Sequence, residues 1–324
     1  EIAVLDAVTE IYAMDPPGVT YDTALALIAL AAHDERLHAR HIRLLADTLI
    51  DWQSGGWGYP DGGDLSNTQY AALGLWAASR AGLEVPVSVW RELFSALGTY
   101  RSKSGGFSYS GGTDSTGSMT TAGIGTLAIC TNGLRSAHAL GGKEEKRAAE
   151  WIQKGLEWLA QNFSVTKNPQ NGAWHYYYLY GLERMGALAD VTLVGEHDWY
   201  REGAEFLVGA QRSDGGWCEG RGQSNVLSTC FALLFLKRAT RPVTAAPTPG
   251  ASKRAGILAR DALVRVIATG EDPLTLWIEG FADEVLERLE WQNEAGRGLH
   301  IRRVSYFADG EQIVSVEGKA GEPA

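Results

Sequence analysis

Clusters of basic residues, long apolar runs and cysteine are all scarce in this chain of 324 residues. The formal net charge is −10 and no basic run occurs, which argues against nucleic acid and anionic membrane surfaces as partners. No apolar run reaches about 18 residues, so we expect no membrane span. The three cysteines lack CxxC spacing and are too few for a disulfide framework, so we interpret them as core or turn thiols.

Glycine and tryptophan, in contrast, are abundant, with 39 and 11 residues. Many of them belong to one short turn pattern, which is most complete in residues 206–217 (FLVGAQRSDGGW). Recurrence at intervals of roughly 50 residues indicates stacked supersecondary units. The turns that we expect to be equivalent are Gly55-Gly56-Trp57, Gly105-Gly106-Phe107, Gly172-Ala173-Trp174 and Gly215-Gly216-Trp217.

Two kinds of helix are predicted around these turns. The amphipathic kind carries charge on one face and covers residues 35–53, 87–101, 143–163 and 199–212. The other kind is nearly uncharged and covers residues 21–32, 66–80, 117–131, 174–188 and 224–238. Because a helix that is apolar all round must be buried on all sides, we predict two concentric layers with the uncharged helices inside. The predicted fold is therefore all-α, an α/α toroid of inner and outer helices.

The composition changes after Arg241. Residues 274–280 and 303–316 show strand-type alternation, and Asp309-Gly310 supplies a hairpin turn, whereas 283–291 fits either a helix or a strand. A protein with further domains is expected. We predict a toroid domain over residues 1–241, a proline-rich linker over 242–252, and a small β-containing module, complete or incomplete, over 253–324.

The segment 206–217 resembles the QW repeat of the terpenoid cyclase and protein prenyltransferase superfamily, which includes squalene cyclase-like proteins. Residues 154–159 (KGLEWL) match the first half of that repeat. The resemblance covers about residues 1–240 and implies a toroid, but no particular activity, because the QW elements of that superfamily are structural. It also implies that four residues tie helix ends together: Gln53, Trp57, Gln211 and Trp217.

The catalytic residues of that superfamily have no counterparts here. The cyclases that the chain resembles protonate their substrate with an aspartic acid of a DxDD motif, and the nearest frame places Tyr21 at the position of the donor. A phenol is far too weak an acid for that step. The prenyltransferases hold zinc with an Asp-x-Cys pair and a histidine, whereas this chain has no Asp-x-Cys and has Ser228 at the expected histidine. We expect no metal site and no cofactor, and whether the protein is an enzyme stays open.

Polar and aromatic residues gather at the predicted starts of the inner helices, around one mouth of the toroid. The most unusual run is 175–180 (HYYYLY), in which some rings point inward unless packing between the layers uses them all. The candidate catalytic residues are Asp22, Asp114 and His175. The candidate cavity-binding residues are Tyr21, Asn67, Tyr176, Tyr177, Tyr180, Asn225 and Cys230.

Two further groups favour structural roles. His38 and His41 have the spacing of metal ligands and lie near His33, but we interpret this segment as a solvated outer helix face. Asp61 and Asp64 lie beside glycines, where turn stabilisation and N-capping are favoured over calcium binding.

These observations predict a non-catalytic binding or scaffold module for an apolar or amphiphilic chain or a polymer segment. An atypical terpenoid cyclase that uses Asp22 or Asp114, or a carbohydrate-active enzyme that uses His175 and tyrosines, is the alternative. A third explanation is a toroid completed by residues before Glu1, because only five inner helices are predicted. The compartment stays open, although a modular chain favours an exported or periplasmic location over the cytoplasm.

Overall fold

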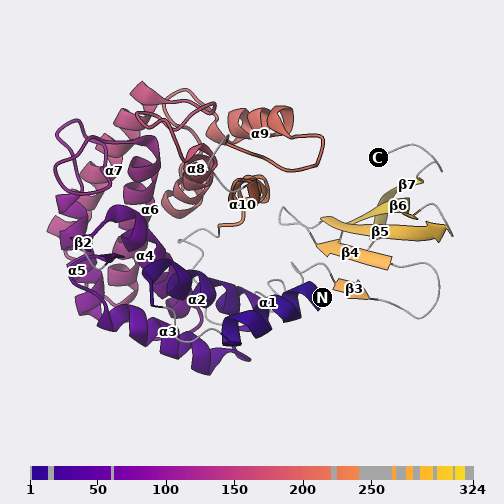
Figure 1. Cartoon of the computed structure of the whole chain (residues 1–324), viewed down its shortest axis with the longest axis horizontal. Helices are drawn as coiled ribbons and strands as arrows, with labels where there is room; N and C mark the ends of the chain where they lie inside the picture. Colours follow the sequence, from indigo (N-terminus) through magenta and orange to yellow (C-terminus); the bar gives the residue numbers. More distant parts are fainter. Residues whose placement is uncertain are drawn as a thin grey trace. The chain divides into compact units, whose positions relative to one another are not determined.

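The chain divides into two compact units, which are Asp6–Ala245 and a second that comprises Glu1–Leu5 with Ala246–Ala324. The first unit is mostly helical, and the second contains a β-sheet (Figure 1). The predicted linker 242–252 lies outside the described residues. The computed structural model describes residues 2–13, 18–59, 62–219, 225–240, 265–267, 275–279, 285–294, 298–308 and 311–317.

The helices predicted from the sequence are all present, with ends that differ by a few residues. One helix, α1, lies outside the predicted set. The helices of the described chain are α1 (Ile2–Ala13), α2 (Thr20–Asp34), α3 (Ala39–Asp51), α4 (Leu65–Arg80), α5 (Val87–Thr99), α6 (Gly117–Ser136), α7 (Gly142–Asn162), α8 (His175–Ala189), α9 (Trp199–Ala210) and α10 (Asn225–Leu236). A short hairpin of β1 (Gly58–Tyr59) and β2 (Gly62–Gly63) precedes α4.

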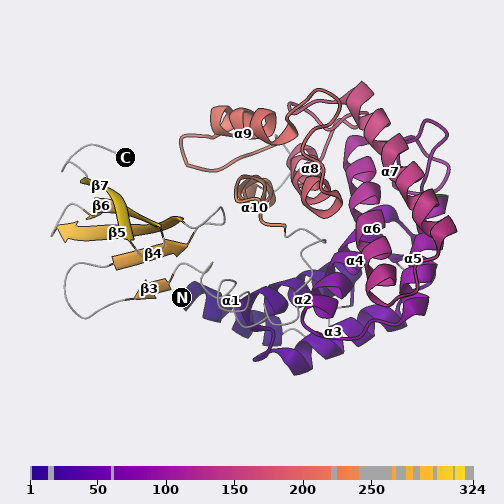
Figure 2. The same ribbon diagram turned by 180° about the vertical axis from the view of Figure 1, so that it is seen from behind.

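These helices alternate between two layers (Figures 1 and 2). Helices α2, α4, α6, α8 and α10 pack against one another in chain order, and α3, α5, α7 and α9 cover them from outside. Residues 117–131 of α6 are all buried, as their uncharged sequence predicts. Helix α7 instead buries an apolar stripe that includes Trp158 and Leu159 and exposes its Lys and Glu residues.

The prediction of burial on all sides is wrong for the first and last members of the inner layer. Helix α2 leaves Leu25 48% exposed, and helix α10 leaves Val226 and Leu233 70% and 47% exposed. Helices α4, α6 and α8 each pack against two inner neighbours, whereas α2 packs against α4 and α10 against α8. The apolar stripes of α2 and α10 therefore lie at the two ends of the layer.

Three of the four glycine turns share one hydrogen-bonding scheme. In each, the main-chain N–H of the aromatic residue donates to a threonine hydroxyl near the start of the next inner helix. The pairs are Trp57 with Thr68 at 3.0 Å, Phe107 with Thr120 at 3.1 Å, and Trp217 with Thr229 at 3.0 Å. The turn is thereby fixed to the helix that follows it, although it stands 11 to 13 residues earlier in the chain.

The tryptophans of these turns tie helix ends together, as the resemblance implies, and Gln53 Nε2 donates to the Val89 carbonyl in the first turn of α5 at 3.0 Å, whereas Gln211 bonds within its own turn. The indole N–H of Trp57 donates to the Leu49 carbonyl at 2.7 Å, and that of Trp217 donates to Leu207 at 2.8 Å. Each carbonyl lies at the end of an outer helix, where it lacks a partner within the helix. The Gln211 amide donates to the carbonyl of Gly215 at 2.8 Å and closes the turn.

The turn at Gly172-Ala173-Trp174 is not equivalent to the others, contrary to the prediction. Trp174 is 50% exposed and has a left-handed backbone with φ of 64°. Asn168, which is 1% exposed, supplies the tie instead, because its Oδ1 accepts from the Ser118 N–H at 2.9 Å and its Nδ2 donates to the Ala173 carbonyl at 3.0 Å. The longer loop before this turn thus replaces an aromatic anchor with a buried amide.

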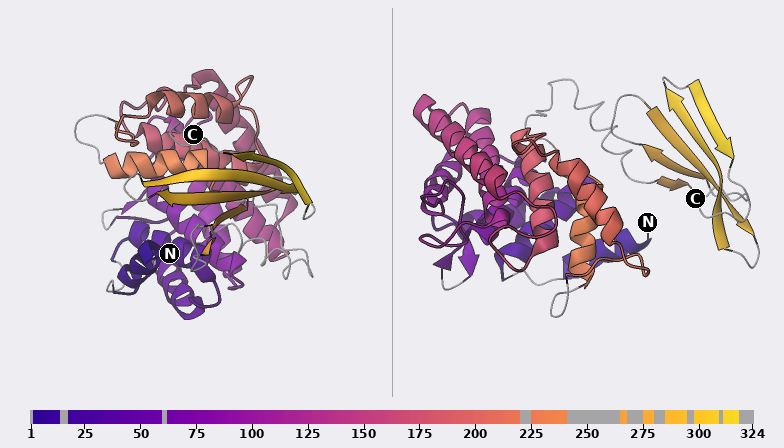
Figure 3. Two further views of the ribbon diagram at one scale, coloured as in Figure 1. Left: turned by 90° about the vertical axis from the view of Figure 1, so that its right-hand side faces the viewer. Right: turned by 90° about the horizontal axis from the view of Figure 1, so that it is seen from above.

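The second unit contains a five-stranded antiparallel sheet in which each strand pairs with the next along the chain (Figure 3). The segment 283–291, which the sequence left undecided, falls largely within strand β5. The predicted turn at Asp309-Gly310 lies outside the described residues. The strands are β3 (Arg265–Ile267), β4 (Thr275–Glu279), β5 (Val285–Glu294), β6 (Gly298–Ala308) and β7 (Glu311–Glu317).

Within the described chain, no helix has both the length and the apolar character that a membrane span requires.

Replacing Thr120 with valine tests the shared turn scheme. The variant keeps the shape of the side chain but leaves the buried Phe107 N–H without its acceptor, so we expect a loss of about 1–3 kcal/mol of unfolding free energy. Urea unfolding followed by circular dichroism measures it. Thr113→Val is the control, because that hydroxyl bonds the Ser110 carbonyl in an exposed turn, and its change should stay within about 0.5 kcal/mol. Equal losses in the two variants would contradict the scheme.

Candidate functional site

Helices α4 and α8 both pack against α6, and polar and aromatic side chains of α4 and α8 contact one another. Tyr21 of α2 joins them. We call this group the tyrosine–arginine cluster; its members are Tyr21, Ser66, Gln69, Tyr70, Tyr177, Tyr180 and Arg184. All seven residues lie in helices that the sequence predicts to be nearly uncharged, yet Arg184 places a full positive charge among them.

A chain of hydrogen bonds runs through the cluster. The Tyr21 hydroxyl donates to Ser66 Oγ at 2.5 Å, and Ser66 Oγ lies 2.7 Å from the Tyr177 hydroxyl. The Gln69 side-chain amide donates to the same Tyr177 oxygen, and its carbonyl oxygen accepts from Arg184 Nη2 at 3.2 Å. Three inner helices are therefore linked by side chains through the interior of their layer.

Arg184 is 4% exposed and is surrounded by aromatic rings. Its guanidinium carbon lies 4.4 Å from the ring centre of Tyr180, 5.0 Å from that of Tyr70 and 5.6 Å from that of Tyr177. Such a cation–π contact stabilises a desolvated cation by about 2 kcal/mol or more. Arg184 Nη1 nevertheless has no hydrogen-bond partner.

Burial determines the acid–base character of the phenols in this cluster. It raises the pKa of Tyr21 and of Tyr177 well above the ordinary value for tyrosine. Both phenols therefore stay protonated at neutral pH and are weaker acids than tyrosine in water. Neither is suited to protonating an alkene or to accepting a proton from a substrate.

The structure brings together only part of the predicted cavity set. Tyr21, Tyr177 and Tyr180 belong to the cluster, whereas Tyr176 is 5% exposed and belongs to a hydrophobic core to which α6, α7, α8, α9 and α10 contribute. The remaining three cavity candidates lie elsewhere. Asn67 is fully buried and bonds Asp64 through its backbone and side-chain nitrogens, both at 2.8 Å, while Asn225 and Cys230 are exposed on α10.

The three candidate catalytic residues do not meet. Asp22 and Asp114 are exposed, so water surrounds the carboxylates that a cyclase would need in a dry cavity. His175 is half-buried, its Nε2 lies 2.8 Å from the Val165 carbonyl, and burial lowers the pKa of its imidazole. His175 lies at the start of α8, where its imidazole bonds the loop before that helix and takes no part in the cluster.

Sequence reasoning missed Glu219, which caps α8 from a distant turn. Glu219 Oε1 accepts from the His175 N–H at 2.6 Å, so a carboxylate satisfies the free N–H groups of a helix start. Burial raises the pKa of this carboxyl, and the backbone N–H groups of α8 oppose that shift. No sequence signal was available, because the cap stands 44 residues from the helix that it serves.

The histidines near α3 form a packed group, so the predicted solvated face is wrong for His38. His38 is 2% exposed; its Nδ1 lies 2.7 Å from the Tyr12 hydroxyl and its Nε2 lies 2.8 Å from His33 Nδ1. The ring of Tyr12 packs on His41 with centres 4.1 Å apart. Nowhere in the described residues do three His, Cys, Asp or Glu side chains gather in a way that suits a metal ion.

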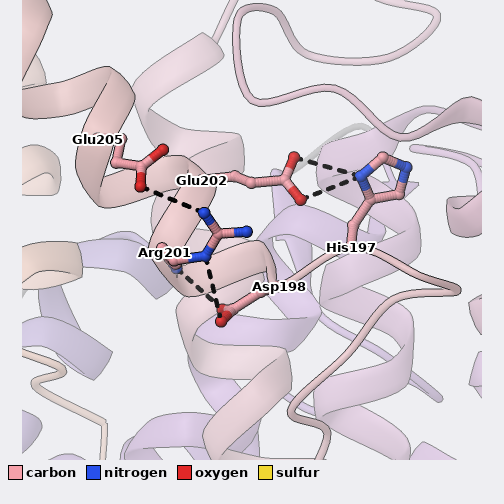
Figure 4. Close-up of polar contacts among 5 residues, drawn as sticks. All are labelled: His197, Asp198, Arg201, Glu202 and Glu205. Atoms are coloured by element: carbon pink, nitrogen blue, oxygen red, sulfur yellow. Dashed lines mark hydrogen bonds and ion pairs between the residues drawn. The ribbon is translucent and has the colours of Figure 1, made fainter.

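Two open surface cavities, of about 460 and 420 Å³, flank the end of α7. Their lining residues come from α7, the loop after it and the loop before α9, and none belongs to an inner helix. His197, at the edge of one, pairs with Glu202 beside the ion pairs of Arg201 with Asp198 and Glu205 (Figure 4). These groups are largely exposed, and such pairs contribute little, so we regard the buried cluster rather than this surface as the site.

Comparison with known proteins adds no assignment. No protein-family model matches the chain, and no curated protein sequence matches it.

Acidification should destabilise the helical unit through His38. Burial, followed by the neighbouring His33, lowers the pKa of His38 below its usual value, although Asp34 opposes this. The unfolded chain therefore binds a proton more readily than the folded one, and stability falls as the pH drops through about 6.5. Thermal unfolding at pH 7.5 and pH 5.5 measures the loss.

The variant His38→Gln should unfold with a smaller difference between the two pH values than the natural chain. His138→Asn is the matched control, because His138 is exposed and asparagine tolerates its left-handed backbone of φ 53°. If the control reduces the pH dependence as much as His38→Gln does, the dependence arises elsewhere.

Proposed function

We propose that the helical unit is an α/α toroid related to the terpenoid cyclases and protein prenyltransferases, and that it binds a ligand without transforming it. The alternation of inner and outer helices and the repeated threonine-bonded turns support the toroid. The ligand is an apolar or amphiphilic chain that contacts the aromatic side of the tyrosine–arginine cluster.

The observation that carries this proposal is the chemistry of the cluster. The cluster consists of phenols, an amide, a hydroxyl and a guanidinium, and none of these is the strong acid that a cyclase of that superfamily needs. The pKa values of Tyr21 and Tyr177 move away from acidity rather than toward it. The groups are suited to holding a ligand through hydrogen bonds and ring contacts, and not to generating a carbocation.

Half-buried aromatic rings supply the surface for an apolar chain. Tyr180 of α8 and Phe231 of α10 are both half-buried, and their rings stack with centres 5.9 Å apart. Phe231 also contacts Tyr177, at 5.6 Å between ring centres, so the aromatic surface is continuous with the buried part of the cluster. Aromatic rings bury a large area at a small entropic cost, which suits them to this role.

An enzyme that uses Asp22, Asp114 or His175 is a less well supported alternative. The two aspartates are exposed, and the imidazole of His175 bonds a loop carbonyl. The Asp22→Asn variant should therefore leave any measured activity unchanged, and an activity lost in that variant would favour the cyclase.

Incubation of the full chain with squalene and with prenyl diphosphates should yield no product, while a fluorescent amphiphile should bind. Removing an aromatic contact surface by Tyr180→Ala should weaken binding by about 10-fold or more. Tyr109→Ala is the control, because Tyr109 is 45% exposed in the loop before α6 and lies outside the cluster. A cyclised product, or equal weakening by both variants, would overturn the proposal.

A further inference from the structure

Arg184 is a buried cation without a counter-ion in the described chain. The ion pairs among the described residues use other cationic side chains, which are those of Arg135, Lys154, His197, Arg201 and Arg212. The carboxylate next to it in sequence, Glu183, is held by Thr240, whose N–H and hydroxyl donate to it at 3.0 and 2.7 Å. Removing a charge from water costs several kcal/mol unless another charge compensates for it.

The hydroxyl groups of the same cluster leave one O–H proton outside their mutual hydrogen bonds. The hydroxyls of Tyr21, Ser66 and Tyr177 form only two bonds among themselves, so one of their three O–H protons takes part in neither bond. If Ser66 donates to Tyr177, the Tyr177 proton is left over, and if Tyr177 donates, the Ser66 proton is left over. Either way one hydroxyl and Arg184 Nη1 have N–H or O–H groups to offer to an anion.

The surrounding rings offset only part of this cost. Three tyrosine faces attract the guanidinium through their quadrupoles, yet a ring face does not replace the hydrogen bonds that Nη1 would make in water. A buried polar group without a partner in a native protein calls for an ion, a water molecule or a ligand. The spare O–H proton and the positive charge together favour an anion.

The number of charges limits the kind of anion. Arg184 is the only cationic member of the cluster, so a group with one negative charge is neutralised, whereas a diphosphate would keep most of its charge in a poorly solvated place. A planar carboxylate matches the guanidinium geometry. Next to Arg184, the half-buried rings of Tyr180 and Phe231 provide an apolar surface.

We propose that Arg184 and a hydroxyl of the tyrosine–arginine cluster bind the carboxylate of an aliphatic acid whose chain lies against Tyr180 and Phe231. This inference rests on the proposed function, because it names the head group of the ligand bound there. The ligand class is therefore a long-chain monocarboxylate, and a small free carboxylate would share only its head-group contacts.

Calorimetry with dodecanoate, dodecanol and acetate on the full chain separates the contributions of head group and chain. We expect dodecanoate to bind at least about 10-fold more tightly than dodecanol, since charge-assisted hydrogen bonds are the stronger kind. We also expect acetate to bind more weakly than dodecanoate. Equal binding of dodecanoate and dodecanol would overturn the head-group inference and leave the proposed function standing.

Two other outcomes are equally decisive. If neither dodecanoate nor dodecanol binds, the proposed function fails together with this inference. If acetate binds as tightly as dodecanoate, the chain makes no contact and the assignment to an aliphatic acid is overturned. All of these comparisons use the natural chain and need no variant.

Variants then locate the head group. Arg184→Met should abolish the preference for dodecanoate over dodecanol, and Tyr177→Phe, which removes one hydroxyl with little change of shape, should reduce it severalfold. Arg238→Met is the matched control, because Arg238 also stacks on aromatic rings, at 4.8 Å from Tyr200, but is exposed. A preference that survives in both Arg184→Met and Tyr177→Phe would place the carboxylate elsewhere.

Discussion

Helices α4 and α6 begin at buried residues, and the free backbone N–H groups at these starts and at the start of α8 must find partners. Asp64 and Thr116 cap α4 and α6 from the adjacent residue, and Glu219 caps α8 from a turn far away in the chain. In the repeated turns the relation is reversed, since a threonine on the helix accepts the N–H of the turn. These hydrogen bonds between turns and helices fix where α4, α6, α8 and α10 start, and thereby which of their side chains reach the interior.

Local patterns predicted the helices and the two layers well, because uncharged and amphipathic stretches differ along the whole chain. They could not predict the partners of Arg184 that come from α4, of which Gln69 lies 115 residues away in the chain. The prediction of a solvated face for His38 failed for the same reason, because the residue that covers it, Tyr12, lies on a different helix, α1. The predicted equivalence of the Gly172-Ala173-Trp174 turn was wrong because Asn168, a residue outside the repeated pattern, forms the bonds that link this turn to α6.

The tyrosine–arginine cluster changes the expected nature of the inner layer. The sequence suggested an aromatic-lined hollow entered from one mouth, yet Ser66, Gln69 and Tyr177 bond directly between α4 and α8. Side chains that meet between buried, nearly uncharged helices are usually apolar. Here they form a connected polar group with one charge. Polar groups in such surroundings specify their neighbours strongly, because any other arrangement leaves donors unpaired.

The chain-order packing of the inner helices also bears on how the unit comes apart. Each inner helix contacts the inner helix before it and the inner helix after it along the chain. The layer therefore behaves as a nearly linear array whose terminal members have the fewest stabilising contacts. Helix α6, enclosed over residues 117–131, stands in the middle of that array. Partial unfolding would therefore spread inward from α2 and α10, and the amide protons of α6 would be the last to exchange with solvent.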